Sequence, residues 1–141
     1  MGLVEQNIEV MKRAVAAAND GTMATVAPQV IAPGFVRHDP TDALPGVAES
    51  GGFIQTLRSA MPDLRVTTED IFGAGDRVAM RIRVTGTHTG EVLGIPPTGR
   101  GVEFSGINIY RLKHGKIAET WQLPDVWGFM TQVGAVKGSG V

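Results

Sequence analysis

The spacing of apolar residues along this chain changes once, near residue 62, and that change limits what the chain can fold into. Before it, apolar residues recur every three or four positions, as in Val4, Ile8, Met11 and Val15, which is the period of an amphipathic helix. After it, apolar and polar residues alternate, as in residues 77–87, which is the period of a half-buried strand. Helices followed by a run of strands predict an α+β fold.

Turn residues divide the chain into elements. The sequence predicts helices at residues 3–19, 22–30, 47–61 and 126–133, and strands at residues 35–38, 64–72, 77–87, 102–112 and 116–123. Residues 90–101 are rich in Gly and Pro and predict a loop. A chain of 141 residues has the length of one ordinary domain. We expect a single domain over residues 1–136 and a flexible tail over residues 137–141.

Composition excludes several classes of function. The chain has no cysteine, so it can use neither a thiolate nucleophile nor a thiolate metal site. Thirteen Lys and Arg balance fourteen Asp and Glu without runs of like charge, which argues against a nucleic-acid partner. Apolar stretches are far shorter than the ~20 residues of a membrane span. The first residues also lack a signal-peptide pattern, so we expect a cytoplasmic protein with no membrane partner.

Motifs for metal or cofactor binding are not found in the sequence. The three histidines, His38, His88 and His114, are scattered without metal-ligand spacing. No glycine-rich phosphate loop follows a predicted strand. We therefore expect neither a metal nor an organic cofactor.

Four short motifs in a fixed order carry a family resemblance. They are Phe35–His38, Gly86–Gly90, Gly94–Arg100 and Gly115–Trp121, followed by Asp125, Gly128, Gln132 and Gly134. With them, residues 35–134 resemble the SnoaL-like polyketide cyclase branch of the nuclear-transport-factor-2-like superfamily. The resemblance implies a cone: a curved, mostly antiparallel sheet, three N-terminal helices and a short C-terminal helix around one pocket.

The resemblance also implies a function and partners. Polyketide cyclases of this family close a ring on a polyketide ester by intramolecular aldol condensation, which is proton-transfer chemistry without a cofactor. The implied ligand is small, apolar and polyketide-like. The implied assembly is a homodimer or a higher homo-oligomer. We expect it to form through the outer sheet face, where Arg81, Arg83 and Thr85 would lie.

One position departs from the family pattern. An acidic residue directly follows the position of Trp121 in the family, and this chain has Gln122 there. An amide cannot accept and return a proton at neutral pH. Under the cyclase hypothesis His38, His88 or Asp125 serves as the base, while Gln122 and Asn108 hold the carbonyl oxygen. The simpler interpretations are a helix cap for Asp125, a structural turn for His88, a loop anchor for His38 and a satisfied buried amide for Gln122.

The pocket lining can be proposed from strand alternation. Asn108 shares a strand face with Val102, Phe104, Gly106 and Tyr110, and a buried amide there needs a hydrogen-bond partner. We interpret it as pocket-lining. The other candidate substrate-binding residues are Arg37, Met80, Phe104, Trp121, Phe53 and Trp127, and the aromatic residues near the C-terminus also suit core and pocket wall.

Two other functions stay open at this point. A chain that kept the pocket and lost the acid can be a non-catalytic small-molecule binding protein. The same pocket can also host another reaction, such as isomerisation, dehydration or hydrolysis, because one fold supports many chemistries.

Overall fold

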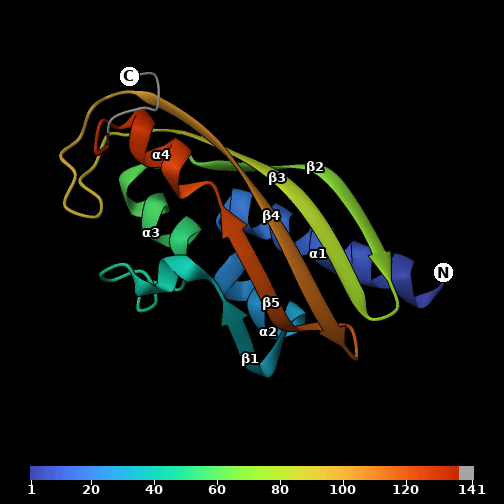
Figure 1. Ribbon diagram of the computed structural model, residues 1–141. Coiled ribbons are helices and arrows are strands. Elements are labelled where there is room, and N and C mark those ends of the chain that lie inside the picture. Colours follow the sequence, from blue (N-terminus) through green and yellow to red (C-terminus); the bar gives the residue numbers. More distant parts are fainter. Residues whose placement is uncertain (137–141) are drawn as a thin grey trace. The chain divides into compact units, whose positions relative to one another are not determined.

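The protein has the predicted α+β fold (Figure 1). The structure is a computed structural model that describes residues 1–136, and the predicted flexible tail, residues 137–141, lies outside the described residues. The helices in this part of the chain are α1 (Leu3–Asp20), α2 (Met23–Val30), α3 (Phe53–Ala60), α4 (Val126–Gln132) and a short 3-10 helix, η1 (Pro40–Ala43). The strands are β1 (Ile31–His38), β2 (Arg65–Ala74), β3 (Arg77–Thr87), β4 (Gly101–Lys113) and β5 (Lys116–Pro124).

The strands form one five-stranded sheet in the order β1-β5-β4-β3-β2. Two-residue turns join β2 to β3 and β4 to β5, and such turns connect antiparallel neighbours. His114 and Gly115 form the second turn with φ of 52° and 74°, as a hairpin turn that follows the twist of the strands requires. β1 runs parallel to β5, with His38 opposite Trp121 and a register shift between Ile31 and Val36.

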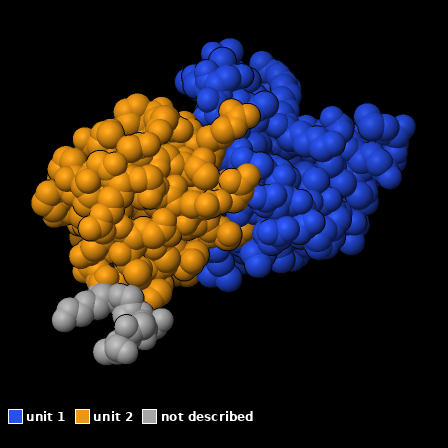
Figure 2. Space-filling view, turned by 90° about the horizontal axis from the view of Figure 1, so that it is seen from above, with its two compact units in different colours: residues 1–38, 66–82, 107–123 blue, residues 39–65, 83–106, 124–141 orange. Residues whose placement is uncertain are grey.

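The described chain divides into two compact units (Figure 2). Unit 1 contains residues 1–38, 66–82 and 107–123, and unit 2 contains residues 39–65, 83–106 and the chain from Pro124 onward. The long strands β3 and β4 contribute to both.

In unit 1, α1 buries a narrow stripe of its surface. The stripe consists of Asn7, Met11, Ala14 and Ala17. The predicted stripe of Val4, Ile8, Met11 and Val15 is therefore rotated, and only Met11 belongs to both. Three of the four buried side chains are short, which lets the helix approach its neighbours closely. Gly21 ends the helix in the left-handed conformation, with φ of 80° and its N–H donated to the carbonyl of Ala17.

The end of α1 is tied to β2 by one side chain. The amide of Asn19 donates to the carbonyl oxygen of Val66 at 2.8 Å and accepts from its N–H at 2.8 Å. This pairing occupies both backbone groups of a residue near the start of the strand, so Asn19 acts as a one-residue strand partner.

Unit 2 is built around three phenylalanines. Phe53 of α3, Phe104 of β4 and Phe129 of α4 meet edge to face, with ring centroids 5.7 to 5.9 Å apart. All three are buried. Because such contacts add to the burial of large apolar side chains, this cluster anchors both helices of unit 2 on the sheet.

The third helix is shorter than the sequence predicts. The expected helix at residues 47–61 begins only at Phe53. Gly46, Gly51 and Gly52 take positive φ values of 79°, 92° and 117°, which an α-helix does not allow. Val47 is nevertheless fully buried. The apolar periodicity therefore indicated burial correctly, while the glycines turn the segment into a chain of turns.

Candidate functional site

A cluster of polar side chains lies on the β4 and β5 strands of unit 1. Alternate residues of β4 are buried, from Val102 to Asn108, and Asn108 is only 5% exposed. Its amide nitrogen donates to the phenol oxygen of Tyr110 at 3.1 Å. The side chain of Gln122, on β5, also acts on the Tyr110 phenol and lowers its pKa. Two of the predicted site residues, Asn108 and Gln122, thus meet on a third residue.

The electrostatics of this cluster are set by Tyr110. Burial raises the pKa of the Tyr110 phenol above its ordinary value of 10.0, and the hydrogen bonds of Asn108 and Gln122 lower that pKa by a smaller amount. A hydrogen bond that lowers the pKa of an acid favours its anion, as the donation from Asn108 Nδ2 to the phenol oxygen does. At neutral pH the phenol keeps its proton.

Sequence reasoning did not select Tyr110 as a site residue. It is the only tyrosine of the chain, and it shares the strand face of Asn108. The sequence did offer a signal: Tyr110 lies next to Asn108 on an otherwise apolar strand face. A buried tyrosine usually forms a hydrogen bond with a polar partner.

His38 and Trp121 lie together elsewhere in unit 1. Their rings stack with centroids 5.4 Å apart, and Arg77 lies over the Trp121 ring at 4.9 Å. His38 Nε2 is 2.6 Å from Glu119 Oε2, and Arg111 Nε is 3.1 Å from Glu119 Oε1. The hydrogen bond with His38, and then the one with Arg111, lower the pKa of the Glu119 carboxyl. The ring nitrogen of His38 that contacts Glu119 is therefore already engaged.

His88 is fully buried in unit 2. Its Nδ1 lies 2.9 Å from Thr98 Oγ1, and its backbone pairs with the N–H of Gly99 and the carbonyl of Arg100 at 2.8 and 2.9 Å. Within the described residues, its Nε2 is buried and has no hydrogen-bond partner. His88 thus closes the loop between β3 and β4 and still has one ring nitrogen for a ligand or a proton.

Asp125 caps a helix, as its position in the sequence predicts. Its Oδ1 accepts from the N–H of Gly128 at 2.9 Å, in the first turn of α4. Its own N–H is donated to the carbonyl of Ser105 at 2.8 Å. The next residue but one, Trp127, is 58% exposed, so its interpretation as a core residue is wrong. Trp127 is the second residue of α4, and its side chain lies on the exposed side of that helix.

The remaining predicted binding residues differ in burial. Phe53 and Phe104 are part of the phenylalanine cluster of unit 2, and Met80 is 2% exposed in unit 1. Arg37 is partly buried on β1. Their predicted roles in binding stay predictions, and His114 is exposed in its hairpin turn.

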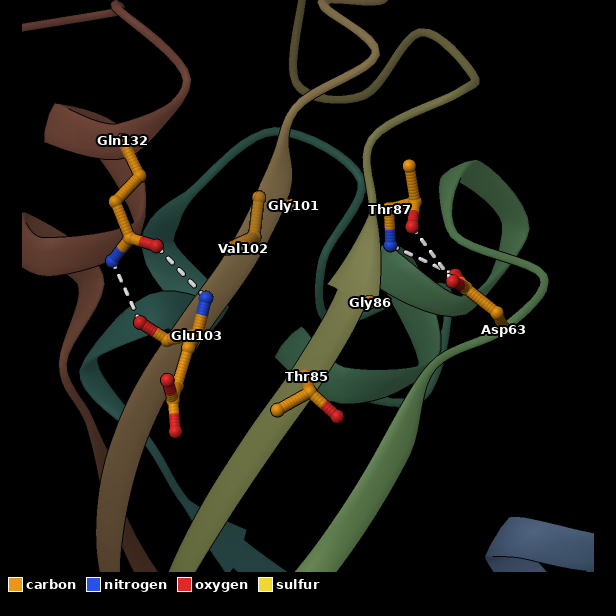
Figure 3. Close-up of a pocket in the computed structure, with 8 residues that line it drawn as sticks. All are labelled: Asp63, Thr85, Gly86, Thr87, Gly101, Val102, Glu103 and Gln132. Atoms are coloured by element: carbon orange, nitrogen blue, oxygen red, sulfur yellow. Dashed lines mark hydrogen bonds between the residues drawn. The ribbon is translucent and has the colours of Figure 1, made fainter.

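Unit 2 also carries an open hollow of about 500 Å³ (Figure 3). Its lining is Asp63, Thr85, Gly86, Thr87, Gly101, Val102, Glu103 and Gln132. Asp63 accepts from the N–H and hydroxyl of Thr87 at 2.8 and 2.7 Å. Gln132 accepts from the N–H of Glu103 and donates to its carbonyl at 2.8 and 2.6 Å. These groups satisfy one another, and none of the predicted site residues is in this lining, so the hollow gives no independent support to the candidate site.

Residues 1–136 contain neither a grouped set of metal ligands nor a helix suited to a membrane. No three His, Asp or Glu side chains in that range are grouped to hold a metal ion. Among the same residues, no helix combines the length and hydropathy that crossing a membrane requires.

Four helices and a five-stranded sheet of this topology define an α+β protein of the nuclear-transport-factor-2-like kind. The SnoaL-like polyketide cyclase family matches residues 8–133, which is most of the chain. The chain therefore belongs to the SnoaL-like polyketide cyclase family.

Named relatives agree with this assignment. The chain is 28% identical over 132 residues to the aklanonic acid methyl ester cyclase DnrD of Streptomyces peucetius, covering 90% of each chain. Among solved structures, AclR from Streptomyces galilaeus matches with a TM-score of 0.80 and 26% identity, over 96% of this chain and 85% of AclR. IdmH from Streptomyces antibioticus matches with a TM-score of 0.75 and 30% identity, over 92% of this chain and 99% of IdmH.

Proposed function

We propose that this protein is a cofactor-independent enzyme that performs proton-transfer chemistry on a small, apolar, polyketide-like ligand, in the form of an intramolecular aldol-type cyclisation. Membership of the cyclase family and the likeness to an aklanonic acid methyl ester cyclase support the reaction class. The observation that supports the proposal most directly is a pair of amide side chains in unit 1, those of Asn108 and Gln122. Both act on the phenol group of Tyr110.

The amides suit one part of an aldol reaction. A base removes a proton from a carbon next to a carbonyl group, and the resulting enolate oxygen needs hydrogen-bond donors. An amide nitrogen carries two hydrogens, and in Asn108 the bond to Tyr110 uses one of them. Asn108 and Gln122 can each offer a hydrogen to the oxygen of a ligand. Gln122 takes the place of the usual acidic residue in this proposal and binds instead of transferring a proton.

The base must then be another residue. Each candidate is constrained by its own contacts: His38 by Glu119, Asp125 by the N-terminus of α4, and His88 by Thr98. His88 is the candidate whose second ring nitrogen is buried without a partner in the described chain. The intrinsic pKa of histidine, ~6.5, suits proton transfer near neutrality. We therefore test His88 by substitution.

A second candidate function is non-catalytic binding of the same kind of ligand. It is favoured by one feature, the amide at residue 122, which cannot exchange a proton as a carboxylate would. A different reaction is a further alternative, because AclR is provisionally described as a hydroxylase. All three functions use the same cluster and differ in whether a proton leaves the ligand.

Deuterium exchange separates these functions. The activated methylene of a β-keto ester polyketide mimic is followed by NMR in deuterated buffer at neutral pH, with wild type, Gln122→Asp and His88→Ala. Exchange by wild type above the buffer rate, lost in His88→Ala, supports the cyclase proposal. Exchange only in Gln122→Asp supports the binding function. Gln55→Asp, a change at an exposed position of α3, controls for the added charge, and no exchange in any variant contradicts the cyclase proposal.

We further propose that the protein forms a homodimer through the outer face of the sheet in unit 1. Exposed apolar residues gather on β1, β4 and β5, which are neighbouring strands. They are Val36, Ile107, Ile109 and Leu123, with 41 to 64% of each exposed. A patch of this kind on a sheet face is typical of an interface.

Analytical ultracentrifugation tests the dimer. Wild type is expected to sediment as a dimer at micromolar concentration and Ile109→Glu as a monomer with an unchanged circular dichroism spectrum. Arg81, expected at the interface from the sequence, is already paired with Asp70 at 2.7 Å, so Arg81→Ala is expected to weaken the dimer less. A monomeric wild type contradicts the proposal. The cytoplasmic location stays a prediction.

A further inference from the structure

His88 is held in place by its own backbone and by the loop that follows it. Its N–H donates to the carbonyl of Arg100 at 2.9 Å, and its carbonyl accepts from the N–H of Gly99 at 2.8 Å. Two residues further on, the N–H of Gly90 donates to the carbonyl of Ala60, at the end of α3, at 2.9 Å. Because the chain is fixed at these points and the side chain is fully buried, the imidazole ring has one defined place in unit 2.

The hydroxyl of Thr98 is the group that contacts Nδ1 of this ring. Thr98 Oγ1 lies 2.9 Å from His88 Nδ1, and the same oxygen accepts from the N–H of Arg100 at 3.2 Å. A hydroxyl oxygen can accept two hydrogen bonds and donate one. Thr98 is exposed, so water can accept the hydrogen of its hydroxyl group. Thr98 can therefore either donate to His88 or accept from it.

The hydrogens of the pair decide between these two arrangements. A neutral imidazole carries one hydrogen, on Nδ1 or on Nε2. If Thr98 donated to Nδ1, the ring hydrogen would lie on Nε2, which is buried and has no hydrogen-bond partner in residues 1–136. If Nδ1 donates to Thr98, every hydrogen of the pair has an acceptor. Because a buried N–H without an acceptor is rare and costly in folded proteins, the second arrangement is the more stable.

We propose that Thr98 is a positioning residue that accepts a hydrogen bond from His88 Nδ1 and so holds the ring in the tautomer whose Nε2 carries no hydrogen. The tautomer itself does not depend on any reaction. Its meaning for catalysis rests on the proposed function, in which His88 is a candidate base. Under that function Nε2 is the nitrogen that receives the proton, and the electron pair of the broken C–H bond stays on the ligand as the enolate.

This partner also suits a base. When Nε2 gains a proton, the ring becomes positively charged, and the hydrogen bond from Nδ1 to Thr98 becomes charge-assisted and stronger. A base that is oriented by a third group is a recurrent arrangement in enzymes. Thr98 thus orients the ring before proton transfer and stabilises its charged form afterwards.

The sequence around Thr98 restrains the position of its hydroxyl. Pro96 and Pro97 precede it, and the ring of each fixes φ at about −65°. Gly99 follows with φ of 70°, a left-handed conformation that favours glycine. The rigid turn brings Thr98 back to His88, which lies 10 residues earlier in the chain. The Gly94–Arg100 motif therefore has a specific task, which is to place one hydroxyl beside one ring nitrogen.

A purely structural role for Thr98 predicts different behaviour. If its hydroxyl only ties the loop together, its removal lowers stability without changing the tautomer of His88. Thr98→Val removes the hydroxyl and keeps the shape of the side chain, and Thr98→Ser keeps the hydroxyl. Thr89→Val is the matched control, because the Thr89 hydroxyl, in the same loop, donates to the carbonyl of Ala60 at 3.4 Å.

Nitrogen-15 NMR of the histidine rings gives the first measurement, at about pH 8, above the ordinary pKa of histidine. The spectrum of His88→Gln identifies the signals of His88 among the three histidines. We expect His88 to carry its hydrogen on Nδ1 in wild type, Thr98→Ser and Thr89→Val, and to gain a form protonated at Nε2 in Thr98→Val. Hydrogen on Nε2 in wild type, or an unchanged tautomer in Thr98→Val, overturns the proposal. The wild-type spectrum keeps this test decisive even if Thr98→Val does not fold.

Deuterium exchange on the β-keto ester mimic separates this inference from the proposed function. We expect Thr98→Val to slow exchange by roughly 10- to 100-fold, as the misplacement of a reacting group does, and Thr98→Ser to restore it. Exchange at the wild-type rate in Thr98→Val overturns Thr98 as a positioning residue and leaves the cyclase proposal standing. No exchange by wild type, with a tautomer that changes in Thr98→Val, contradicts the cyclase reaction and supports the control of the His88 tautomer by Thr98.

Discussion

The amide nitrogen of Asn108 lies 3.1 Å from the phenol oxygen of Tyr110, two residues further along the same strand. Residues at this spacing point to one face of a sheet, so a single strand supplies both members of the pair. Gln122 brings the second amide from the neighbouring strand. The alternation of side chains along β4 and the position of β5 beside β4 therefore bring the polar cluster together, and all three of its residues lie on strands.

The first prediction concerns the ionisation of Tyr110. Burial raises the pKa of its phenol above 10.0, while the bonds of Asn108 and Gln122 partly offset that rise. We expect tyrosinate absorbance, which comes from this residue alone, to appear above the pH at which free tyrosine ionises. Asn108→Leu should move it to still higher pH. Circular dichroism at each pH confirms that the chain is folded, and a titration like that of free tyrosine contradicts the prediction.

The second prediction concerns Gly90, at the end of the motif that contains His88. A Cβ at Gly90 would lie 3.0 Å from the Cα of Ala60, which is backbone and cannot move aside easily. We expect Gly90→Ala to lower the free energy of unfolding by about 1–3 kcal/mol, as overpacking does. Gly101→Ala is the matched control, because no atom lies within 4 Å of its added Cβ. Equal urea midpoints for the two variants would falsify this account.

Most of the fold was predictable because its signals are local. A run of helical period followed by a run of strand period predicted the order of the elements, and glycines at turns marked the ends of β3 and β4. The failures were local as well. Gly51 and Gly52 adopt positive φ and prevent the predicted first turns of α3. Glycines in an apolar segment weaken a helix prediction. Here their backbone conformation prevents a helix, although the side chain of Val47 is buried as a helix prediction expected.

The candidate site was less predictable because its hydrogen bonds join side chains, and the periodicity of a strand does not specify such bonds. Family resemblance directed attention to Gln122 and Asn108, and the sequence placed Tyr110 on the same face as Asn108. Tyrosine is common in strands for packing reasons alone. Its hydrogen bond with Asn108 is seen only in the structure. Trp127 shows the opposite case: an aromatic residue in a short helix suggested core, and the helix turns it outward.

The third prediction concerns Gln132, whose side chain substitutes for a strand partner. Its amide accepts from the N–H of Glu103 and donates to the carbonyl of the same residue, at 2.8 and 2.6 Å (Figure 3). Its amide nitrogen also donates to the carbonyl of Gly128 at 3.0 Å. We expect Gln132→Ala to lower the free energy of unfolding by about 1–2 kcal/mol, because water can partly replace these hydrogen bonds. Gln55→Ala, at an exposed position of α3, should change it by less than about 0.5 kcal/mol. Urea unfolding followed by tryptophan fluorescence measures both, and equal stability of the two variants would contradict the role of Gln132.

The last prediction concerns the stability of the fold at acidic pH. The N–H and then the hydroxyl of Thr87 lower the pKa of the Asp63 carboxyl below its ordinary value of 3.8, and His38 and Arg111 do the same for Glu119, whose ordinary value is 4.5. A carboxyl whose pKa is lower in the folded than in the unfolded state stabilises the fold above its unfolded pKa. That stabilisation is lost as the pH falls through the folded pKa.

We therefore expect stability to be constant with respect to these two groups from pH 7 to about pH 5 and to fall progressively below pH 4. Glu119→Gln should reduce the slope of stability against pH in the acid range, because one of the two groups no longer binds a proton on unfolding. Glu49→Gln, at an exposed position of unit 2, is the matched control and should keep the wild-type slope. Urea midpoints at several pH values measure the slope, and a wild-type slope in Glu119→Gln would show that the contacts of Glu119 with His38 and Arg111 do not favour its charged form.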